Sequence, residues 1–339
     1  MHKCVLMFSG GLDSVVAAHL LKEQGLEVIA LHFVLPFYSG IGRSEREVQK
    51  YAEKLGVSLR IEEEGEEFLE MIKDPSFGYG KNANPCVDCR IHRVMKAKKI
   101  MEEKDAVCLA TGEVTGQRPM SQRMDCLYKI ERLSGLKGKL LRPLSAKLLE
   151  PTDAEVAGII DRDKLLDISG RSRKVQLEYA RKYGLSHASP AGGCLLTNSQ
   201  TAVRFNDLAA HSPDFSLFDF KLIAWGRHFR TSSSYKLVVS RNESENDVLE
   251  KLFSSGMYLF GLRDVPGPLA LGTGEPTEKE LWFSASVVAR FSKARKEKSV
   301  AVWAESGGGK RILEVEPASE VDLKDCRINS SEIEAVSKY

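Results

Sequence analysis

The chain has 339 residues, of which 42% are hydrophobic and 28% are charged, and its formal net charge is +2. This composition is ordinary for a soluble globular protein, and the length favours two domains over a single core. No apolar run approaches the roughly 20 residues that span a bilayer, and the N-terminus lacks the layout of a signal peptide, so we expect a cytoplasmic protein without a membrane partner.

The first half of the chain alternates strand-like with helix-like segments. Short apolar runs predict strands at residues 4–8, 28–34, 58–61, 106–110 and 140–144. Helices are predicted at residues 15–25, 44–55, 66–72, 88–104, 153–160 and 172–183. This alternation predicts an α/β domain with a doubly wound parallel sheet, in which ligands bind beyond the carboxyl ends of the strands.

The character of the sequence changes near residue 215. Strands are predicted at residues 221–225, 235–239, 257–262, 300–304 and 311–315, and helices at residues 245–253 and 278–296. We therefore expect a second, smaller α+β domain. With the linker at residues 210–216, the predicted domains are residues 1–210 and 216–339.

The first predicted strand runs directly into Ser9-Gly10-Gly11-Leu12-Asp13-Ser14, and a helix follows. Glycines let a backbone approach phosphate closely, N–H groups at a helix start point at an anion, and the two serines add hydroxyl donors. Asp13 cannot face bare phosphate, so we expect it to act through Mg²⁺ or a water. The stretch resembles the pyrophosphatase-type loop (PP-loop) of enzymes that convert ATP to AMP and pyrophosphate while adenylating a substrate. The resemblance implies that residues 9–14 bind ATP on a sheet of the PP-loop type.

A second Gly-rich stretch, residues 306–310, lacks the upstream glycine and the following Ser or Thr of a Walker loop. We predict a turn there and not a second nucleotide site.

Two further segments indicate which substrate the enzyme adenylates. Residues 84–89, Asn-Pro-Cys-Val-Asp-Cys, resemble the Asn-Pro-Cys-x-x-Cys segment of tRNA 2-thiouridylases. Residues 111–122, which begin Thr-Gly-Glu-Val-Thr-Gly-Gln and end in Ser-Gln, resemble a segment of tRNA 4-thiouridine synthetases. Over residues 1–185 the chain therefore resembles the PP-loop tRNA thiouridine synthetase family, which implies that Gly112 and Gln117 lie at the nucleotide. The C-terminal region does not resemble the β-barrels of 2-thiouridylases, so the modified uridine, and the choice between its 2- and 4-positions, stay open.

Seven cysteines, an odd number in a reducing compartment, argue against a disulfide framework. Cys86 and Cys89 lie near the start of a predicted helix whose dipole favours thiolates, and Cys194 follows two glycines that permit close approach to a metal. Three thiolates that hold a [4Fe-4S] cluster with one open iron, which can bind sulfide, resemble the pattern of cluster-dependent tRNA thiolases. Persulfide chemistry with a resolving cysteine and a structural zinc are the alternatives. Cys4 and Cys108 are expected in the core. Cys126 is a weaker candidate for a role in the sulfur chemistry.

One reaction uses both motifs. A uridine carbonyl oxygen is a poor leaving group, so ATP first adenylates it, and sulfur then attacks the carbon while AMP leaves. The loop and Mg²⁺ would stabilise the developing charge. The candidate catalytic residues are Asp13, Cys86, Cys89 and Cys194, and the sulfur donor is sulfide or a persulfide-carrying protein. The sequence thus predicts an ATP-dependent tRNA sulfurtransferase.

The C-terminal region carries three short motifs in order. Residues 240–247, Ser-Arg-Asn-Glu-Ser-Glu-Asn-Asp, the turn 266–268 and the helix end 289–295 resemble the RNA-binding domain of the NFACT-R type. The resemblance implies RNA contacts, for which the candidate residues are Arg241, Asn242, Arg290, Lys293 and Arg295. Residues 86–147 add a basic stretch with 14 Lys and Arg against 7 Asp and Glu, which suits a polyanion, although solvated helix faces would look the same. A small packing or oligomerisation domain is the alternative.

Three other functions remain open on the sequence: a PP-loop enzyme that adenylates a small molecule, an iron–sulfur desulfidase of thiolated bases, and an RNA-binding adaptor with an inactive nucleotide fold. The sequence does not determine the oligomeric state.

Overall fold

The structure, a computed structural model, describes residues 1–38, 43–189 and 194–328. The chain divides into two compact units, Met1–Cys194 and Leu195–Tyr339. None of the helices described in these ranges is both long and apolar enough to cross a membrane.

Parallel strands form the sheet of the first unit. They are β1 (Lys3–Met7), β2 (Glu27–Val34), β3 (Ser58–Glu63), β4 (Cys108–Thr111) and β5 (Leu140–Leu141). Their order across the sheet is β3-β2-β1-β4-β5, and every neighbouring pair is parallel. The strand order reverses between β1 and β4, so the loops that follow these two strands flank a crevice at the carboxyl edge of the sheet. The predicted doubly wound α/β fold is confirmed.

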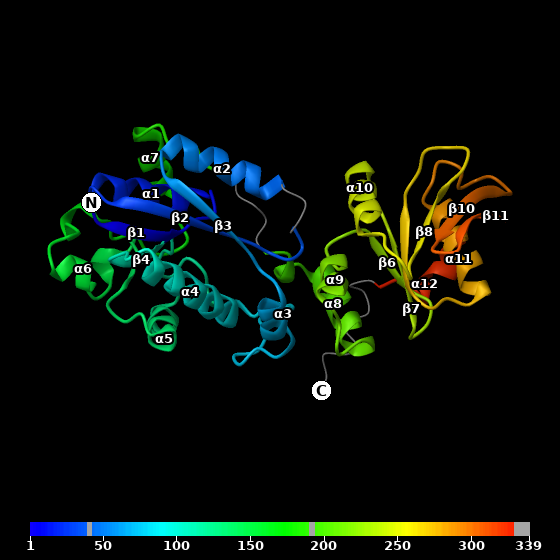
Figure 1. Ribbon diagram of the computed structural model, residues 1–339, viewed down its shortest axis with the longest axis horizontal. Helices are drawn as coiled ribbons and strands as arrows, with labels where there is room; N and C mark the ends of the chain where they lie inside the picture. Colours follow the sequence, from blue (N-terminus) through cyan, green and yellow to red (C-terminus); the bar gives the residue numbers. More distant parts are fainter. Residues whose placement is uncertain (39–42, 190–193, 329–339) are drawn as a thin grey trace. The chain divides into compact units, whose positions relative to one another are not determined.

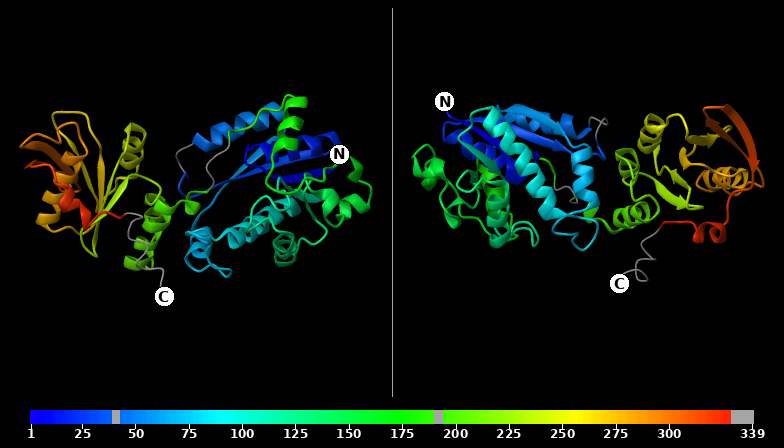
Figure 2. Two further views of the ribbon diagram at one scale, coloured as in Figure 1. Left: turned by 180° about the vertical axis from the view of Figure 1, so that it is seen from behind. Right: turned by 60° about the horizontal axis from the view of Figure 1, so that its bottom comes forward.

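Helices cover both faces of this sheet (Figures 1 and 2). One face packs against α1 (Leu12–Glu23), α2 (Arg43–Leu55) and α7 (Lys174–Lys182), and the other against α4 (Cys86–Glu103) and α5 (Met124–Ser134). Cys4 and Leu6 of β1 enter the first core, whereas Val5 and Met7 enter the second, as expected for a strand buried on both faces. Shorter elements complete the unit: α3 (Glu66–Lys73), α6 (Asp153–Val156) and the 3₁₀ helices Ala146–Leu148 and Arg162–Lys164.

Antiparallel strands form the sheet of the second unit, in the order β11-β10-β8-β9-β7-β6. They are β6 (Arg227–Arg230), β7 (Tyr235–Val239), β8 (Tyr258–Leu262), β9 (Ala270–Gly274), β10 (Val300–Ser306) and β11 (Gly309–Val315). Helix α10 (Glu243–Leu252) packs on one face, and α11 (Glu278–Arg290) and α12 (Glu320–Lys324) on the other (Figure 1). The second unit is therefore α+β, as predicted.

The predicted elements of the second unit need two corrections, and several elements were not predicted. Residues 221–225 are not a strand, because α9 (Leu217–Leu222) occupies the start of this run and Gly226, at φ +67°, turns the chain into β6. The helix predicted at 278–296 ends at Arg290, where the Ser292 hydroxyl donates to the Ala289 carbonyl oxygen at 2.7 Å. The strands β6 and β9 and the helix α12 were not predicted. The turn expected within residues 306–310 is the hairpin turn between β10 and β11, which consists of Gly307 and Gly308.

The two compact units divide earlier in the chain than the predicted linker. The 3₁₀ helix Leu195–Thr197 and α8 (Ser199–His211) lie in the second unit. The buried Arg204 of α8 donates to the carbonyl oxygens of Ile223 at 3.0 Å and Gly226 at 2.8 Å. The Phe205 ring lies 5.9 Å from that of Phe215 and 6.3 Å from that of Phe220, between centroids. These contacts tie α8 to the second unit, whereas the sequence placed residues up to 210 with the first.

Candidate nucleotide and sulfur site

The loop after β1 is closed by its own serines. The Ser9 and Ser14 hydroxyl oxygens lie 3.2 Å apart, the Ser14 hydroxyl donates to the Gly11 carbonyl oxygen at 2.8 Å, and the Gly11 N–H donates to the Ser9 hydroxyl at 3.3 Å. Gly11 is the N-cap of α1 and has no side chain with which to cap this helix. Apart from the Gly11 N–H, the first N–H groups of α1 have no side-chain acceptor among the described residues, and N–H groups at a helix start of this kind bind phosphate.

Two glycines are required by the packing of this loop. Gly10 adopts φ +72°, and a Cβ there would lie 3.0 Å from the Tyr51 ring of α2. Gly112 follows β4, and a Cβ there would lie 2.7 Å from the Ser14 nitrogen and 2.8 Å from the Asp13 carbonyl carbon. The loops after β1 and β4 thus touch backbone to backbone where the strand order reverses, so the structure brings the predicted residues Ser9–Ser14 and Gly112 together.

Asp13 and Gln117 also meet in this crevice. The Gln117 side-chain amide donates to one oxygen of the Asp13 carboxylate at 3.3 Å. The other oxygen is buried and accepts no hydrogen bond from the described residues. A buried carboxylate oxygen without a donor suits a hard cation such as Mg²⁺. Leu12, by contrast, has a fully buried side chain in the core, so only its backbone can face a nucleotide.

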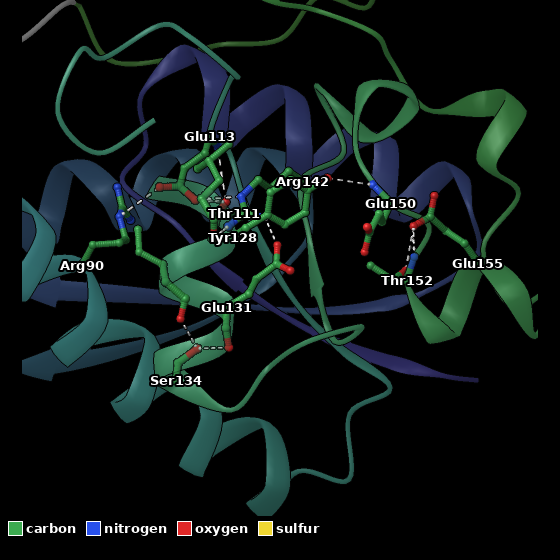
Figure 3. Close-up of polar contacts among 12 residues, drawn as sticks. Arg90, Thr111, Glu113, Tyr128, Glu131, Ser134, Arg142, Glu150, Thr152 and Glu155 are labelled. Atoms are coloured by element: carbon green, nitrogen blue, oxygen red, sulfur yellow. Dashed lines mark hydrogen bonds and ion pairs between the residues drawn. The ribbon is translucent and has the colours of Figure 1, made fainter. Parts of the chain in front are cut away.

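A buried network of ion pairs connects the loop after β4 with α4, with α5 and with the segment after β5 (Figure 3). The Glu113 carboxylate, 2% exposed as a residue, pairs with Arg90 of α4 at 3.1 Å and with Arg142, after β5, at 3.2 Å. The hydroxyl of Thr111 donates to the same carboxylate at 3.0 Å, and Arg142 also pairs with Glu131 of α5. Burial opposes ionisation, but the two guanidinium groups and the hydrogen bonds keep the pKa of Glu113 below its ordinary value. The network ties α4, which carries the two neighbouring cysteines, to the loop that carries Gly112.

Cys86 and Cys89 lie in the first turn of α4, which begins two residues earlier than predicted. The Asn84 side-chain amide donates to the Cys86 sulfur at 3.3 Å, and the Cys89 N–H donates to the Pro85 carbonyl oxygen at 2.9 Å. Burial raises the pKa of the Cys89 thiol, and the positive charges of Arg93 and Arg90 oppose this only in part. The expectation that the helix start favours a thiolate is therefore outweighed by burial at Cys89.

Arg93 is the charged group that links Cys89 with Cys194. Burial lowers the pKa of its guanidinium, but its electrostatic interactions with Cys89, Glu64 and Cys194 raise that pKa above the ordinary value. Both thiols therefore lie in the field of one cation. One terminal nitrogen of Arg93, Nη2, is buried and has no hydrogen-bond partner among the described residues, which leaves a donor for an anionic sulfur.

Glu64, directly after β3, anchors this cation. Its buried carboxylate accepts from His92 at 3.0 Å, from Arg93 at 3.0 Å and from Lys96 at 3.1 Å. Burial would raise the pKa of Glu64, but the His92 hydrogen bond and the charge of Arg93 lower it to about 2. The Arg93 guanidinium also lies over the ring of Phe33, 5.6 Å from its centroid. Its position is therefore fixed from two sides.

The three predicted metal ligands are not shown as an assembled site. Among residues 1–38, 43–189 and 194–328, no three His, Cys, Asp or Glu side chains gather as ligands for a metal ion. The glycines before Cys194, within residues 190–193, lie outside the described residues. Of the other cysteines, Cys4 and Cys108 are buried in the core with their sulfurs 3.3 Å apart, as predicted. Cys126 is buried in α5.

The predicted RNA-binding residues differ in their surroundings. Arg241 pairs with the buried Glu245, and Arg290 pairs with Glu320 at 2.6 Å. The Asn242 side chain caps α10 by accepting from the Glu245 N–H at 3.1 Å. Lys293 and Arg295 follow α11 and are exposed. They are the most available of the five for phosphate.

Two acidic residues that position the site were not singled out from the sequence. Glu64 lies just beyond a strand that was predicted to end at residue 61, and Glu113 lies inside the segment 111–117. The signal for both is a carboxylate directly after a parallel strand, at the edge where ligands bind.

In comparison with known proteins, the N-terminal and C-terminal regions match two different families. Residues 1–148 match the family model described as Thiamine biosynthesis protein (ThiI), and residues 226–326 match the NFACT protein RNA binding domain. A protein of Thermococcus kodakarensis named "Probable tRNA sulfurtransferase" is 28% identical over 171 residues, which cover 49% of this chain and 40% of that protein. The tRNA-specific 2-thiouridylase of Pelobacter propionicus is 34% identical over 118 residues, which cover 32% of this chain and 33% of that protein. The matched regions thus span well under half of these curated relatives.

Two solved structures resemble parts of the chain. A 4-thiouridine synthetase–RNA complex with bound ATP is 24% identical, covers 52% of this chain and 50% of that chain, and has a TM-score of 0.35. The U34-tRNA thiolase NcsA from Methanococcus maripaludis, with its [4Fe-4S] cluster, is 19% identical, covers 65% of this chain and 70% of that chain, and has a TM-score of 0.33. By these matches, residues 1–148 are similar to the family described as Thiamine biosynthesis protein (ThiI), and residues 226–326 are similar to the NFACT protein RNA binding domain.

Proposed function

We propose that this protein is an ATP-dependent tRNA sulfurtransferase, which adenylates a uridine carbonyl oxygen and replaces that oxygen with sulfur. The observation that carries the proposal is the crevice between β1 and β4, where the Ser9–Ser14 loop and Gly112 meet backbone to backbone. Helix α4, tied to the same loop through Glu113, carries Cys86 and Cys89. The loop that would bind the nucleotide and the cysteines that would supply sulfur are therefore connected through the Glu113–Arg90 ion pair. Relatives named as tRNA sulfurtransferase and 2-thiouridylase agree with it.

In the first step the uridine carbonyl oxygen attacks the α-phosphorus of ATP, and the bond to pyrophosphate breaks. The N–H groups at the start of α1 and the hydroxyls of Ser9 and Ser14 would hold the departing pyrophosphate. Asp13, whose second oxygen has no described donor, would hold Mg²⁺ and so offset the charge of the phosphates. Gln117 orients the Asp13 carboxylate.

In the second step a sulfur nucleophile bonds to the activated carbon, the carbon–oxygen bond breaks and AMP leaves. Arg93, with its unpartnered nitrogen, would hold an anionic sulfur near Cys89 and Cys194. Cys86, Cys89 and Cys194 would hold a [4Fe-4S] cluster, which supplies an open iron for sulfide when bound. With persulfide chemistry instead, the sulfane sulfur of one cysteine is transferred and a second cysteine closes a disulfide, which a thiol must then reduce.

The second unit would bind the tRNA. Its NFACT-type match and the exposed basic residues after α11 support this role. The oligomeric state, the modified position and the physiological sulfur donor are not part of the proposal.

The test is to incubate anaerobically reconstituted protein with ATP, Mg²⁺, sulfide and unmodified tRNA, and to analyse the nucleosides by mass spectrometry. We expect uridine to gain the mass difference between sulfur and oxygen, with one AMP and one pyrophosphate released per thiouridine. Chromatography against standards then separates 2- from 4-thiouridine. A variant with Asp13→Asn should bind tRNA but form no thiouridine.

Other results of this assay would indicate one of the alternative functions. ATP turnover without tRNA, and without any thionucleoside, would point to a small-molecule acceptor. Loss of sulfur from thiolated tRNA without ATP would indicate a desulfidase. RNA binding without pyrophosphate release would indicate an adaptor with an inactive nucleotide fold.

A further inference from the structure

The loop between α3 and α4, residues 74–85, leads directly into the helical turn that carries Cys86 and Cys89 (Figure 1). It carries two exposed aromatic residues. We call it the aromatic loop. Phe77 is 44% exposed and Tyr79 is 41% exposed. The Phe77 side chain belongs to none of the described core clusters, so its exposure calls for an explanation.

Hydrogen bonds hold the aromatic loop in one conformation. The Phe77 N–H donates to the buried Asp88 carboxylate of α4, at 3.2 Å to the nearer oxygen. The Tyr79 hydroxyl donates to the Ile72 carbonyl oxygen at the end of α3. The Gly80 N–H donates to the Asn84 carbonyl oxygen at 3.0 Å. The two rings are therefore displayed by a fixed backbone.

The aromatic loop adjoins both halves of the proposed reaction. Asn84, at its end, donates to the Cys86 sulfur at 3.3 Å and to the Met120 sulfur at 3.7 Å. Met120, 38% exposed, belongs to the segment that continues from Gln117, so the loop lies between the sulfur ligand and the nucleotide segment. Gly80 allows this contact, since a Cβ there would lie 2.5 Å from the Met120 sulfur.

The charges around the rings are mainly positive. The Lys129 ammonium of α5 lies 4.9 Å from the centroid of the Phe77 ring. On the loop and on residues 117–129, the exposed charged residues are Lys81, Arg118, Arg123 and Lys129 against Asp74 and Asp125. Arg123 pairs with Asp125, at 3.1 Å. The surface therefore favours an anionic partner with flat apolar faces, and unpaired nucleotides have both properties.

We propose that the aromatic loop is the RNA platform of the sulfur site: Phe77 stacks an unpaired base next to the nucleotide presented to Cys86, and Lys129 contacts its phosphate. The identity of the RNA as a thiolation substrate rests on the proposed function, but the stacking itself does not. Tyr79, whose ring is fixed through its hydroxyl, forms the edge of the platform. An unpaired base fits here and a duplex does not, because stacking on Phe77 requires a free base face.

The test compares RNA binding by full-length variants without ATP, sulfide or reducing chemistry. The variants are Phe77→Leu, Phe77→Tyr and Lys129→Gln. Tyr183→Leu is the matched control, because Tyr183 is 42% exposed in the same unit and has the Lys182 ammonium 5.0 Å from its ring centroid. Dissociation constants are measured for unmodified tRNA at two salt concentrations, and a photoreactive benzoylphenylalanine at position 77 locates the contacted nucleotides.

We expect Phe77→Leu to weaken tRNA binding roughly 5- to 150-fold, the range for loss of one base stack, while Phe77→Tyr and Tyr183→Leu stay within about twofold. Lys129→Gln should lower the salt dependence by the release of about one counterion. The cross-link should fall on an unpaired nucleotide. A Phe77→Leu protein that binds tRNA as tightly as Tyr183→Leu, or a cross-link confined to duplex nucleotides, would overturn the platform.

The remaining outcomes separate this inference from the proposed function. If wild-type protein forms no thiouridine but Phe77→Leu still loses tRNA affinity, the platform stands and the thiolation proposal fails. If Phe77→Leu keeps its tRNA affinity but no longer accepts sulfur from a persulfide-carrying protein, the loop docks that protein and the RNA platform is refuted.

Discussion

Gly112 shows how one atom decides whether the nucleotide crevice can form. A Cβ at this position would lie 2.7 Å from the Ser14 nitrogen and 2.9 Å from the Asp13 carbonyl oxygen. Both contacts are with backbone, so neither can be relieved by a rotamer change. The loop after β1 would have to move away from the loop after β4.

We therefore expect Gly112→Ala to weaken ATP binding by at least about tenfold, measured by calorimetry with Mg²⁺ and ATP. Gly65→Ala is the control, because a Cβ at Gly65 meets no atom within 4 Å. If Gly112→Ala binds ATP like Gly65→Ala, the crevice between the two loops is not the nucleotide site.

Glu64 gives the first unit a stability that depends on pH. Its folded pKa of about 2 lies below the ordinary value of 4.5, so the ionised carboxylate stabilises the fold above pH 4.5 and this contribution is lost as the pH falls toward 2. We expect Glu64→Gln to lower the free energy of unfolding by roughly 2–3 kcal/mol at pH 7, and the difference from wild type to shrink below pH 4.5.

The measurement must report the first unit alone. The three tryptophans, Trp225, Trp282 and Trp303, all belong to the second unit, so their fluorescence serves as the internal control. Hydrogen exchange of peptides from β3 and α4 in urea follows the first unit. Glu103→Gln, which removes an exposed carboxylate paired with Arg60, should change little at any pH. A pH-independent effect of Glu64→Gln would contradict the assignment of a charged, paired Glu64.

The cysteines provide a test of the proposed cluster. Cys86→Ala or Cys194→Ala should remove a broad absorption near roughly 400 nm from anaerobically reconstituted protein, because each would take away one of the iron ligands. Cys326→Ala, in the second unit, should leave the absorption unchanged. An unchanged spectrum in the first two variants would favour persulfide chemistry or zinc.

At the scale of elements, helix α8 shows that a boundary is decided by packing and not by composition. Arg204 supplies donors to two carbonyl oxygens at the turn before β6, and Phe205 contacts the rings of Phe215 and Phe220. Without α8, these carbonyl oxygens and rings would be left without their buried partners.

We expect a fragment of residues 195–339 to show a cooperative thermal transition in tryptophan fluorescence. A fragment of residues 216–339 should melt at a lower temperature or aggregate. Equal melting temperatures would show that α8 is not needed for the second unit to fold.

The predicted strand at residues 221–225 illustrates the limit of apolar runs at the same scale. Leu222, Ile223, Ala224 and Trp225 look like a buried strand, but Ser216 and Asp219 form a capping box that starts a helix at Leu217. The run is buried because the end of that helix and the following turn pack on the sheet. Burial is the same in both cases, so hydrophobicity did not distinguish them.

At the scale of the whole molecule, the proposal assigns ATP binding to the first unit and tRNA binding to the second. A fragment of residues 1–194 should bind ATP as the full chain does and lose at least about tenfold in tRNA affinity, because the basic residues after α11 are absent. Filter binding of labelled tRNA and calorimetry with ATP give the two affinities. Full tRNA affinity in the short fragment would mean that the NFACT-type unit serves another purpose.

The sequence by itself determined the alternation of strands and helices in the first unit, the glycine-rich loop after the first strand and the two neighbouring cysteines. These features are local: a glycine-rich loop after an apolar run, or two cysteines in one helical turn, have the same meaning wherever the chain later folds. The same holds for the α+β character of the second unit, whose alternating segments are readable one by one.

Only the tertiary structure decided which of these residues meet. It brought Gly112 against Asp13 and Ser14, paired Glu113 with Arg90 and Arg142, and placed Arg93 in the field of two cysteines about one hundred positions apart in the chain. It also assigned α8 to the second unit and left Phe77 and Tyr79 exposed in the loop that precedes Cys86. The physical reason is that burial and charge pairing depend on the neighbours supplied by other elements, and a single sequence does not state which elements those are.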